Sequence, residues 1–226
     1  MKRSEINRYI AEADAFFRYN GFLLPPFARW TPDDWRHRAS ETGELHSARL
    51  GWDITDFHSG HFDTFGLTLF TLRNGTSAGR TSAKPYAEKI MFVRRGQVTP
   101  FHYHVRKTED IINRGGVDTG RLALQLYNSD GNGGFAQTPV SVFCDGLERC
   151  LDAGGTITLG PGESITLTPY LYHTFYAVGG DCLVGEVSSI NDDDADNYFK
   201  EPLPRYPAIV EDEPPARLLC TEYPTS

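Results

Sequence analysis

Residues 96–116 read GQVTPFHYHVRKTEDIINRGG and bring two histidines and a glutamate within a few positions of one another. His102 and His104 lie two apart in a stretch with strand character, so their side chains point to the same face. Glu109 follows after a bend that can return its side chain to that face. Imidazoles and a carboxylate together form a common ligand set for divalent metals. The stretch therefore predicts a metal site on a β-strand; the alternative is two structural histidines beside a surface acid.

The composition and charge of the chain exclude several classes of function for such a site. The 226 residues are 39% hydrophobic and 23% charged, which suits one globular domain with a sizeable core. The net charge of −8 and the lack of a basic run argue against nucleic acid as a partner. No window approaches eighteen apolar residues and the N-terminus is too polar for a signal peptide, so no membrane role is expected. The four cysteines form no C-x-x-C pair, which indicates reduced thiols of a cytoplasmic protein.

The N-terminal segment, residues 1–45, is predicted to be helical. Apolar residues recur at helical spacing in its first part: Ile6, Ile10, Ala13 and Phe17. Ser4 is the expected N-cap of this helix, and Gly21 lies just past its end. A second helix is expected to begin after Thr31, which precedes a proline and two aspartates.

From about residue 50 the pattern changes to short apolar runs separated by turn residues, which predicts an all-β sandwich or barrel. The expected strands are 67–72, 87–93, 98–105, 121–127, 139–144, 155–159, 163–168, 172–178 and 181–188. Residues 73–84 are expected to form a loop. We predict a single domain over 1–226, with the barrel at 50–190, the helices packed at one end, and an irregular, acidic, proline-rich tail at 191–226.

The histidine stretch resembles the first motif of the cupin family, G(X)5HXH(X)3-4E(X)6G, without a gap. The second motif, G(X)5PXG(X)2H, is met in part. Gly162 and His173 have the expected separation, but Pro169 comes one residue late and the inner glycine is missing. The resemblance implies a cupin-type β-barrel, or jelly roll, in which His173 joins His102, His104 and Glu109 as a metal ligand. Such a set would leave positions on the metal open for a substrate.

A resemblance over longer stretches indicates a more specific activity. Residues 86–116, 124–131 and 185–193 are similar to cupin-type D-lyxose isomerases, and EDIINRGG at 109–116 is the most distinctive piece. The resemblance implies a homodimeric, Mn²⁺-dependent enzyme, with other divalent metals as alternatives. It would interconvert D-lyxose and D-xylulose, and also D-mannose and D-fructose.

The chemistry requires a base that moves a proton between C2 and C1 of the sugar, and an electrophile that stabilises the enediolate. If Gly179–Gly180 is a hairpin turn, His173 falls opposite Glu186, which makes Glu186 the candidate base. If Arg95–Gly96 is a second turn, Lys89 falls opposite His102 and would be a cation near the sugar oxygens. Solvent-facing strand residues are the alternative for both.

Further substrate contacts are less marked in the sequence. Asp193 is a candidate for binding sugar hydroxyls, although a solvated run of aspartates explains it as well. Arg106 and Lys107 would suit a phosphate, but no glycine-rich phosphate loop accompanies them, so a free sugar is expected. Two other classes of cupin remain as alternatives: an iron-dependent dioxygenase and a non-catalytic sugar-binding protein.

Overall fold

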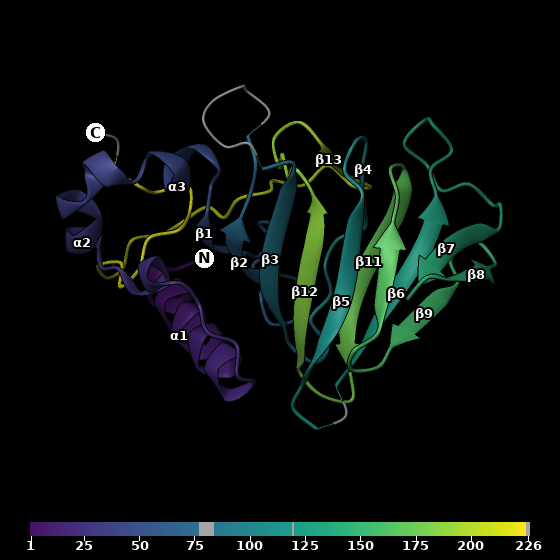
Figure 1. Ribbon diagram of the computed structural model, residues 1–226, viewed down its shortest axis with the longest axis horizontal. Helices are drawn as coiled ribbons and strands as arrows, with labels where there is room; N and C mark the ends of the chain where they lie inside the picture. The colour runs from purple at the N-terminus through teal and green to yellow at the C-terminus, as the bar shows by residue number, and fades with distance from the viewer. Residues whose placement is uncertain (77–83, 119, 225–226) are drawn as a thin grey trace.

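The computed structural model describes residues 1–76, 84–118 and 120–224, so most of the loop expected at 73–84 lies outside the described residues. The strands form two antiparallel sheets that face each other (Figure 1). The larger sheet runs in the order β1 (Gly51–Thr55), β2 (Leu67–Arg73), β3 (Tyr86–Val93), β12 (Cys182–Ser189), β5 (Glu109–Gly116), β10 (Ser164–Leu167), β7 (Val140–Cys144) and β8 (Leu147–Leu151). The smaller runs in the order β13 (Asn197–Phe199), β4 (His102–His104), β11 (Leu171–Val178), β6 (Arg121–Asn128) and β9 (Thr156–Leu159). The cupin-type all-β architecture is confirmed.

Side-chain alternation along β3 explains how one strand serves two cores. Met91 points between the sheets into the main core, which also contains Ile111 and Leu124. Ile90 and Phe92 point to the opposite face and pack in a second core beneath the N-terminal helix. Because successive side chains alternate in a strand, Lys89 shares the interior face with Met91. A charged side chain is thereby directed between the sheets.

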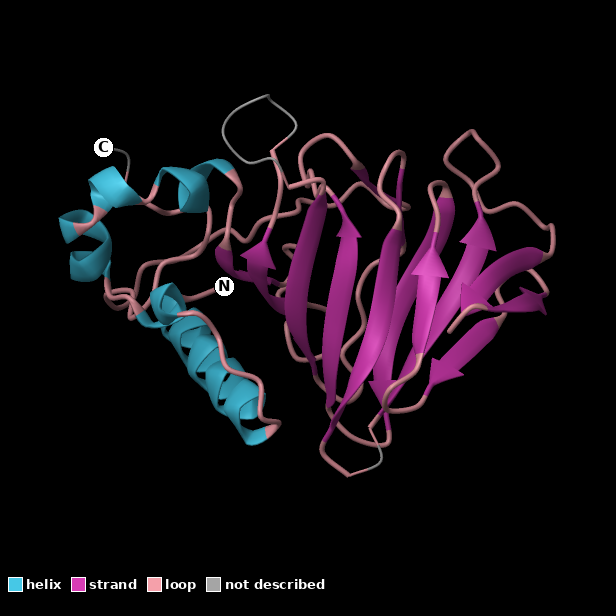
Figure 2. Cartoon of the chain, in the orientation of Figure 1, coloured by secondary structure: helices cyan, strands magenta, loops and turns pink. Residues whose placement is uncertain are grey.

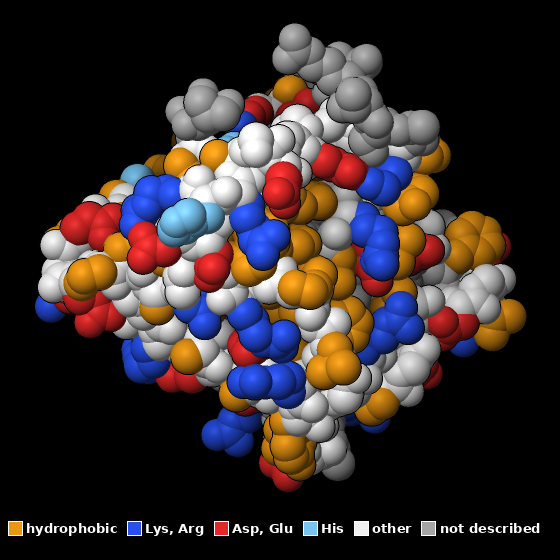
Figure 3. Space-filling view, turned by 60° about the vertical axis from the view of Figure 1, so that its left-hand side comes forward, with side chains coloured by type: hydrophobic (Ala, Val, Ile, Leu, Met, Phe, Trp, Pro, Cys, Tyr) orange, Lys and Arg blue, Asp and Glu red, His pale blue; other side chains and the backbone are white. Residues whose placement is uncertain are grey.

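The helices lie at the β1 end of the sheets, as predicted (Figure 2). They are α1 (Arg3–Tyr19), η1 (Pro26–Arg29), α2 (Pro32–His37), η2 (Ala39–Glu41) and α3 (Gly43–Ser47). The buried face of α1 packs on the outer face of the larger sheet, against Trp52 and Phe70. Its other face is polar, and Figure 3 shows acidic and basic side chains among hydrophobic ones on this side of the molecule. Among the described residues no helix is long and apolar enough to span a membrane.

The helix starts were predicted with mixed success. Thr31 caps α2 as expected, because its Oγ1 accepts a hydrogen bond from the amide of Asp34 at 3.2 Å. Ser4 does not cap α1; that prediction was wrong. The N-cap is Lys2, whose amide donates to Glu5, while the hydroxyl of Ser4 donates to Asp212 in the C-terminal tail. The hydroxyl of Ser4 therefore binds a residue far away in the chain instead of the backbone of its own helix.

Every predicted strand range overlaps an observed strand, but within the described part of the chain four strands were not predicted: β1, β5, β8 and β13. The range 98–105 shortens to β4, since Pro100 has no amide hydrogen to donate to a ladder. Strand β5 was missed because EDIINRGG contains polar residues and two glycines that carry no strand signal.

The C-terminal tail is largely irregular and runs from the barrel back to α1. Its far end is held by Arg3, a side chain that is 2% exposed. The guanidinium donates to Glu211 Oε1 at 2.6 Å and to Glu222 Oε2 at 3.0 Å, so one buried cation joins the first helix to two points of the tail.

Arg3→Met is expected to lower the free energy of unfolding by about 2 kcal/mol, because it leaves two carboxylates without their cation. The partial exposure of Glu211 and Glu222 keeps this loss below that of a fully buried pair. Urea denaturation measures the change, with Arg8→Met as the control. Arg8 forms an exposed pair with Glu12, for which less than about 0.5 kcal/mol is expected. Equal effects of the two substitutions would contradict the assignment.

Candidate metal and catalytic site

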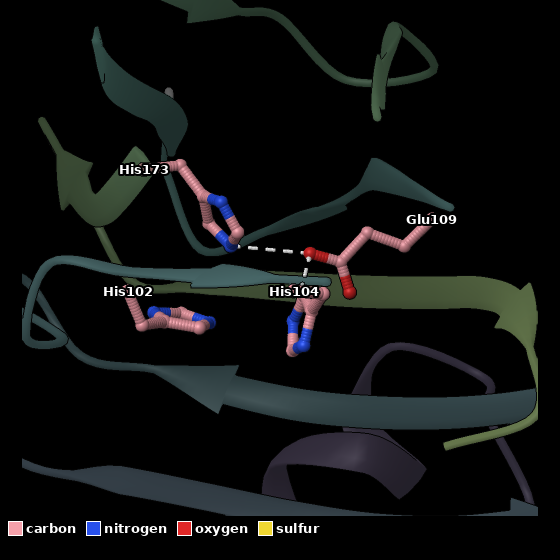
Figure 4. Close-up of side chains that lie close together, drawn as sticks. All are labelled: His102, His104, Glu109 and His173. Atoms are coloured by element: carbon pink, nitrogen blue, oxygen red, sulfur yellow. Dashed lines mark ion pairs between the residues drawn. The ribbon is translucent and has the colours of Figure 1, made fainter. Parts of the chain in front are cut away.

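Four side chains meet between the two sheets, near β4, which is the second strand of the smaller sheet. His102 and His104 come from β4, His173 from β11 and Glu109 from the first position of β5. Each offers one ligand atom, and these atoms all lie within 4.8 Å of one another. Strand pairing explains part of this, because His173 lies directly opposite His102 in the β4–β11 ladder. Glu109 reaches the histidines from the facing sheet (Figure 4).

Hydrogen bonds orient each imidazole. In all three histidines Nδ1 contacts a backbone carbonyl, at 3.0 Å for His102, 2.9 Å for His104 and 3.0 Å for His173. A carbonyl can only accept, so Nδ1 carries the proton and Nε2 presents a lone pair to the cluster. This is the arrangement in which metal-ligating histidines are usually held.

The electrostatics of the cluster call for a cation. Burial, followed by the charges of its neighbours, lowers the pKa of His102 well below its usual value, and burial together with Lys107 lowers the pKa of His104 to about 4. Both imidazoles are therefore neutral at neutral pH, which metal binding requires. Nε2 of His104 and of His173 are buried without a hydrogen-bond partner, and His173 Nε2 lies 3.1 Å from a Glu109 oxygen. Converging lone pairs of this kind fit a divalent metal ion.

Two lysines and a second glutamate lie beside this cluster. Glu186 on β12 is 7% exposed, and its Oε1 is 3.2 Å from Lys89 Nζ and 2.9 Å from Lys107 Nζ. Lys107 also reaches Glu109 Oε2 at 2.6 Å. Lys107 thus connects the candidate base to a candidate metal ligand. The suggestion that Lys107 could contact a phosphate is not supported, because its side chain is buried in these ion pairs.

The strand pairing that places Glu186 and Lys89 in the site differs from the predicted pairing. Gly179–Gly180 does not close a hairpin within one sheet: β11 belongs to the smaller sheet and β12 to the larger. Glu186 therefore pairs with Lys89 and Ile111, and faces His173 across the interior. The chain does turn after Arg94, whose carbonyl accepts from the amide of Gln97, but it too crosses between sheets. Lys89 is consequently not opposite His102 on a ladder.

The charged groups hold one another in their ionised forms. Burial alone would raise the pKa of Glu186, but Lys107 and Lys89 lower it below its usual value. Burial would likewise raise the pKa of Glu109, yet the positive charge of Lys107 holds it well below the ordinary range. Burial would lower the pKa of Lys107, and the two glutamates raise it instead. At neutral pH Glu186 and Glu109 are therefore carboxylates and Lys107 is an ammonium group.

The start of the C-terminal tail completes the site. Asn191 Oδ1 accepts from Lys89 at 2.7 Å and from Lys107 at 3.2 Å, while its Nδ2 donates to Asp193. Arg205 forms an ion pair with Asp53 and lies 3.6 Å from Asp193. Asp193 lines the same cavity as Glu186, as its predicted role requires. Asn191 and Arg205 were not predicted, since no periodicity or motif in the tail marks them.

The cavity has a polar side and an apolar side. The polar side includes the four candidate metal ligands together with Lys89, Lys107, Glu186, Asp193 and Arg205. The apolar residues include Leu67, Leu69, Met91, Pro100, Ile111, Phe175 and Phe199. Such a cavity holds a small polar molecule against fixed charges while limiting the access of water.

Comparisons with known proteins agree with this fold. The model of the D-lyxose isomerase family matches residues 1–223. The D-lyxose/D-mannose isomerase of Escherichia coli O157:H7 is 50% identical over 99% of this chain and 98% of its own, and that of Serratia proteamaculans is 49% identical over the same shares. Among solved structures, L-ribose isomerase of Acinetobacter sp. DL28 in complex with L-ribose has a TM-score of 0.59 at 15% identity, covering 92% of this chain and 98% of its own. The ligand-free L-ribose isomerase of Cellulomonas parahominis has a TM-score of 0.57 at 15% identity, covering 93% and 98%.

Proposed function

The chain belongs to the D-lyxose isomerase family, and we propose that this sugar isomerase interconverts D-lyxose and D-xylulose, and D-mannose and D-fructose. The observation that carries the proposal is the placement of an ionised Glu186 between two buried lysines, beside a cluster that suits a divalent metal. Proton transfer on a polar substrate needs this combination, whereas oxygen chemistry or simple binding does not. The family membership also favours an isomerase over the dioxygenase and the non-catalytic binding protein.

Glu186 is the proposed base. Among the described residues Lys89, Lys107 and Ser188 all contact its Oε1, so Oε2 is the oxygen left to accept a proton from the sugar. In the direction from aldose to ketose, the base takes the proton from C2 and returns it to C1, while the proton of the O2 hydroxyl is transferred to O1. The contacts to Oε1 fix the position of the Glu186 carboxylate. It can therefore transfer the proton between C2 and C1 only if the sugar binds with both carbons near Oε2.

The two lysines have different proposed roles. Lys107 uses its three N–H bonds on Glu109, Glu186 and Asn191, so it positions the carboxylates. Lys89 contacts Glu186 and Asn191, which leaves one N–H for a sugar oxygen. Asp193, which accepts a hydrogen bond from Asn191 Nδ2, is proposed to accept another from a sugar hydroxyl.

The proposed metal ligands are His102, His104, Glu109 and His173. Mn²⁺ is the proposed ion, and another divalent cation is the alternative. When bound, such an ion would polarise the sugar oxygens and stabilise the negative charge that forms as the proton leaves. Glu109 would then link the ion to the base through Lys107.

We also propose that the protein is a cytoplasmic homodimer. The four cysteines are free thiols, as expected in a reducing compartment. The outer face of the larger sheet exposes Phe143 and Val187, which the strand register connects in one row through Thr166 and Asp110. Apolar side chains in such a row suit contact with a second copy. A monomeric mass in sedimentation equilibrium would contradict the dimer.

The test of function is incubation of the protein with Mn²⁺ and a panel of aldoses in the absence of oxygen. D-xylulose is expected from D-lyxose and D-fructose from D-mannose, detected by chromatography. Prior treatment with a chelator should abolish conversion, and added Mn²⁺ should restore it. Full conversion in the metal-depleted sample, or no ketose from either sugar, would overturn the proposal.

A further inference from the structure

Strand β13 in the tail extends the wall of the cavity. It pairs with β4 so that Asn197 lies opposite His104 and Phe199 opposite His102. Directly paired residues share a face, so both side chains of β13 point inward beside the histidines. Tyr198 between them points outward, where its ring stacks on Tyr103 at a centroid distance of 5.4 Å. Asn197 and Phe199 accordingly line the same cavity as Glu186.

Asn197 carries a polar atom that the protein leaves unsatisfied. In the described part of the chain, three buried side-chain nitrogen or oxygen atoms have no hydrogen-bond partner: His104 Nε2, His173 Nε2 and Asn197 Oδ1. The two imidazole nitrogens belong to the candidate metal site. The amide oxygen of Asn197 has no such explanation. A buried acceptor without a partner destabilises the folded protein, so such atoms are rare unless a ligand or water meets them.

The nearby cations do not satisfy this oxygen. Lys107 is engaged with Glu109, Glu186 and Asn191, and Lys89 with Glu186 and Asn191. Because no described group of the protein meets this oxygen, its donor must come from within the cavity. The ligand of a sugar isomerase is a polyol, in which each hydroxyl is both a donor and an acceptor. If the amide were turned by 180°, Nδ2 would meet a hydroxyl oxygen instead, so the pairing does not depend on the orientation of the amide.

We propose that Asn197 is a specificity-determining residue that binds one hydroxyl of the sugar. The inference rests on the proposed function, because it takes the occupant of the cavity to be a sugar. A polar group that is paired only in the complex discriminates strongly against an analogue that lacks the matching hydroxyl. Asn197 thus selects among sugars, while Glu186 and the lysines act on the reacting carbons.

The first experiment compares wild type with Asn197→Leu, a change to an apolar side chain of similar size. Binding of D-lyxose to the Mn²⁺-loaded protein is measured by calorimetry, and kcat/KM is measured where turnover occurs. A loss of about 10- to 100-fold in affinity is expected. The metal content should stay the same, and the melting temperature without sugar should be unchanged or higher, because an unpaired buried acceptor has been removed. A purely structural residue would instead lower the melting temperature.

The second experiment identifies the partner hydroxyl. Monodeoxy analogues of D-lyxose are titrated into wild type and Asn197→Leu. One analogue is expected to bind wild type more weakly than D-lyxose, yet to bind the variant as well as D-lyxose does. Asn197→Ala provides a second variant if the leucine disturbs folding, and Tyr198→Phe, on the outward face of the same strand, is the control.

Equal losses for every analogue in both proteins would overturn the assignment. Loss of metal from Asn197→Leu would also overturn it, since Asn197 would then be a metal ligand. If the sugars bind with the expected coupling but are not isomerised, the proposed function fails and the binding role of Asn197 stands.

Discussion

Glu186→Gln is expected to lower kcat by about 100- to 10,000-fold, the range associated with loss of a positioned general base. Glutamine keeps the size of the side chain and can still accept hydrogen bonds at Oε1 from Lys89 and Lys107, but it cannot take a proton from carbon. Glu186 does not belong to the metal-ligand cluster, so the metal content should not change. KM should change much less than kcat, because the lost interaction is with a proton in transit.

The measurement combines steady-state kinetics on D-lyxose with metal analysis of the purified variants. His102→Ala is the comparison that should lose metal. Glu88→Gln is the matched control, because Glu88 lies next to Lys89 on β3 but points to the outer face and pairs with Arg73. Near-normal turnover of Glu186→Gln would contradict the assignment, as would loss of metal equal to that of His102→Ala.

The metal-ligand cluster was the part of the site best defined by sequence. His102 and His104 share a face because of the two-residue period of a strand, Glu109 follows in the same stretch, and the motif resemblance added His173. The structure brings these four together as predicted. Glu186 and Lys89 line the same cavity as this cluster, although the hairpins expected to bring them there are not formed within one sheet. An inward-facing position in a two-sheet barrel approaches the same interior from either sheet, which explains their placement; their catalytic roles stay predictions.

The remaining parts could not be read from local patterns. Lys107 lies only two residues from Glu109, but nothing in a charged, turn-forming segment shows whether a lysine points inward. Asn191, Asn197 and Arg205 lie in a tail that lacks hydrophobic periodicity, and its position depends on contacts with residues far away in the chain, such as Asp53 and His104. The sequence rules describe regular elements, whereas this segment is placed by tertiary ion pairs and a three-residue edge strand.

Lys107→Met is expected to impair both stability and turnover. The substitution leaves Glu109 and Glu186 buried without the ammonium that lies 2.6 and 2.9 Å from their oxygens. An uncompensated buried charge typically costs about 3–5 kcal/mol, so the free energy of unfolding of the metal-depleted protein should fall by that amount. Bound metal should reduce the loss, because it compensates the charge of Glu109.

The pH dependence of Lys107→Met separates a catalytic effect from a stability effect. Burial raises the pKa of Glu186, and the positive charge of Lys107 opposes this effect more strongly than any other neighbouring charge. The pKa of Glu186 should therefore rise when Lys107 is removed. A base works only above its pKa, and the acid limb of the kcat profile should therefore move to higher pH. A neighbouring exposed residue offers a control: Arg106→Met, at a side chain that is 62% exposed, should change the unfolding free energy by less than about 0.5 kcal/mol. An unshifted acid limb in Lys107→Met would mean that Lys107 does not set the ionisation of the base, and that the two carboxylates are balanced by Lys89 and the metal alone.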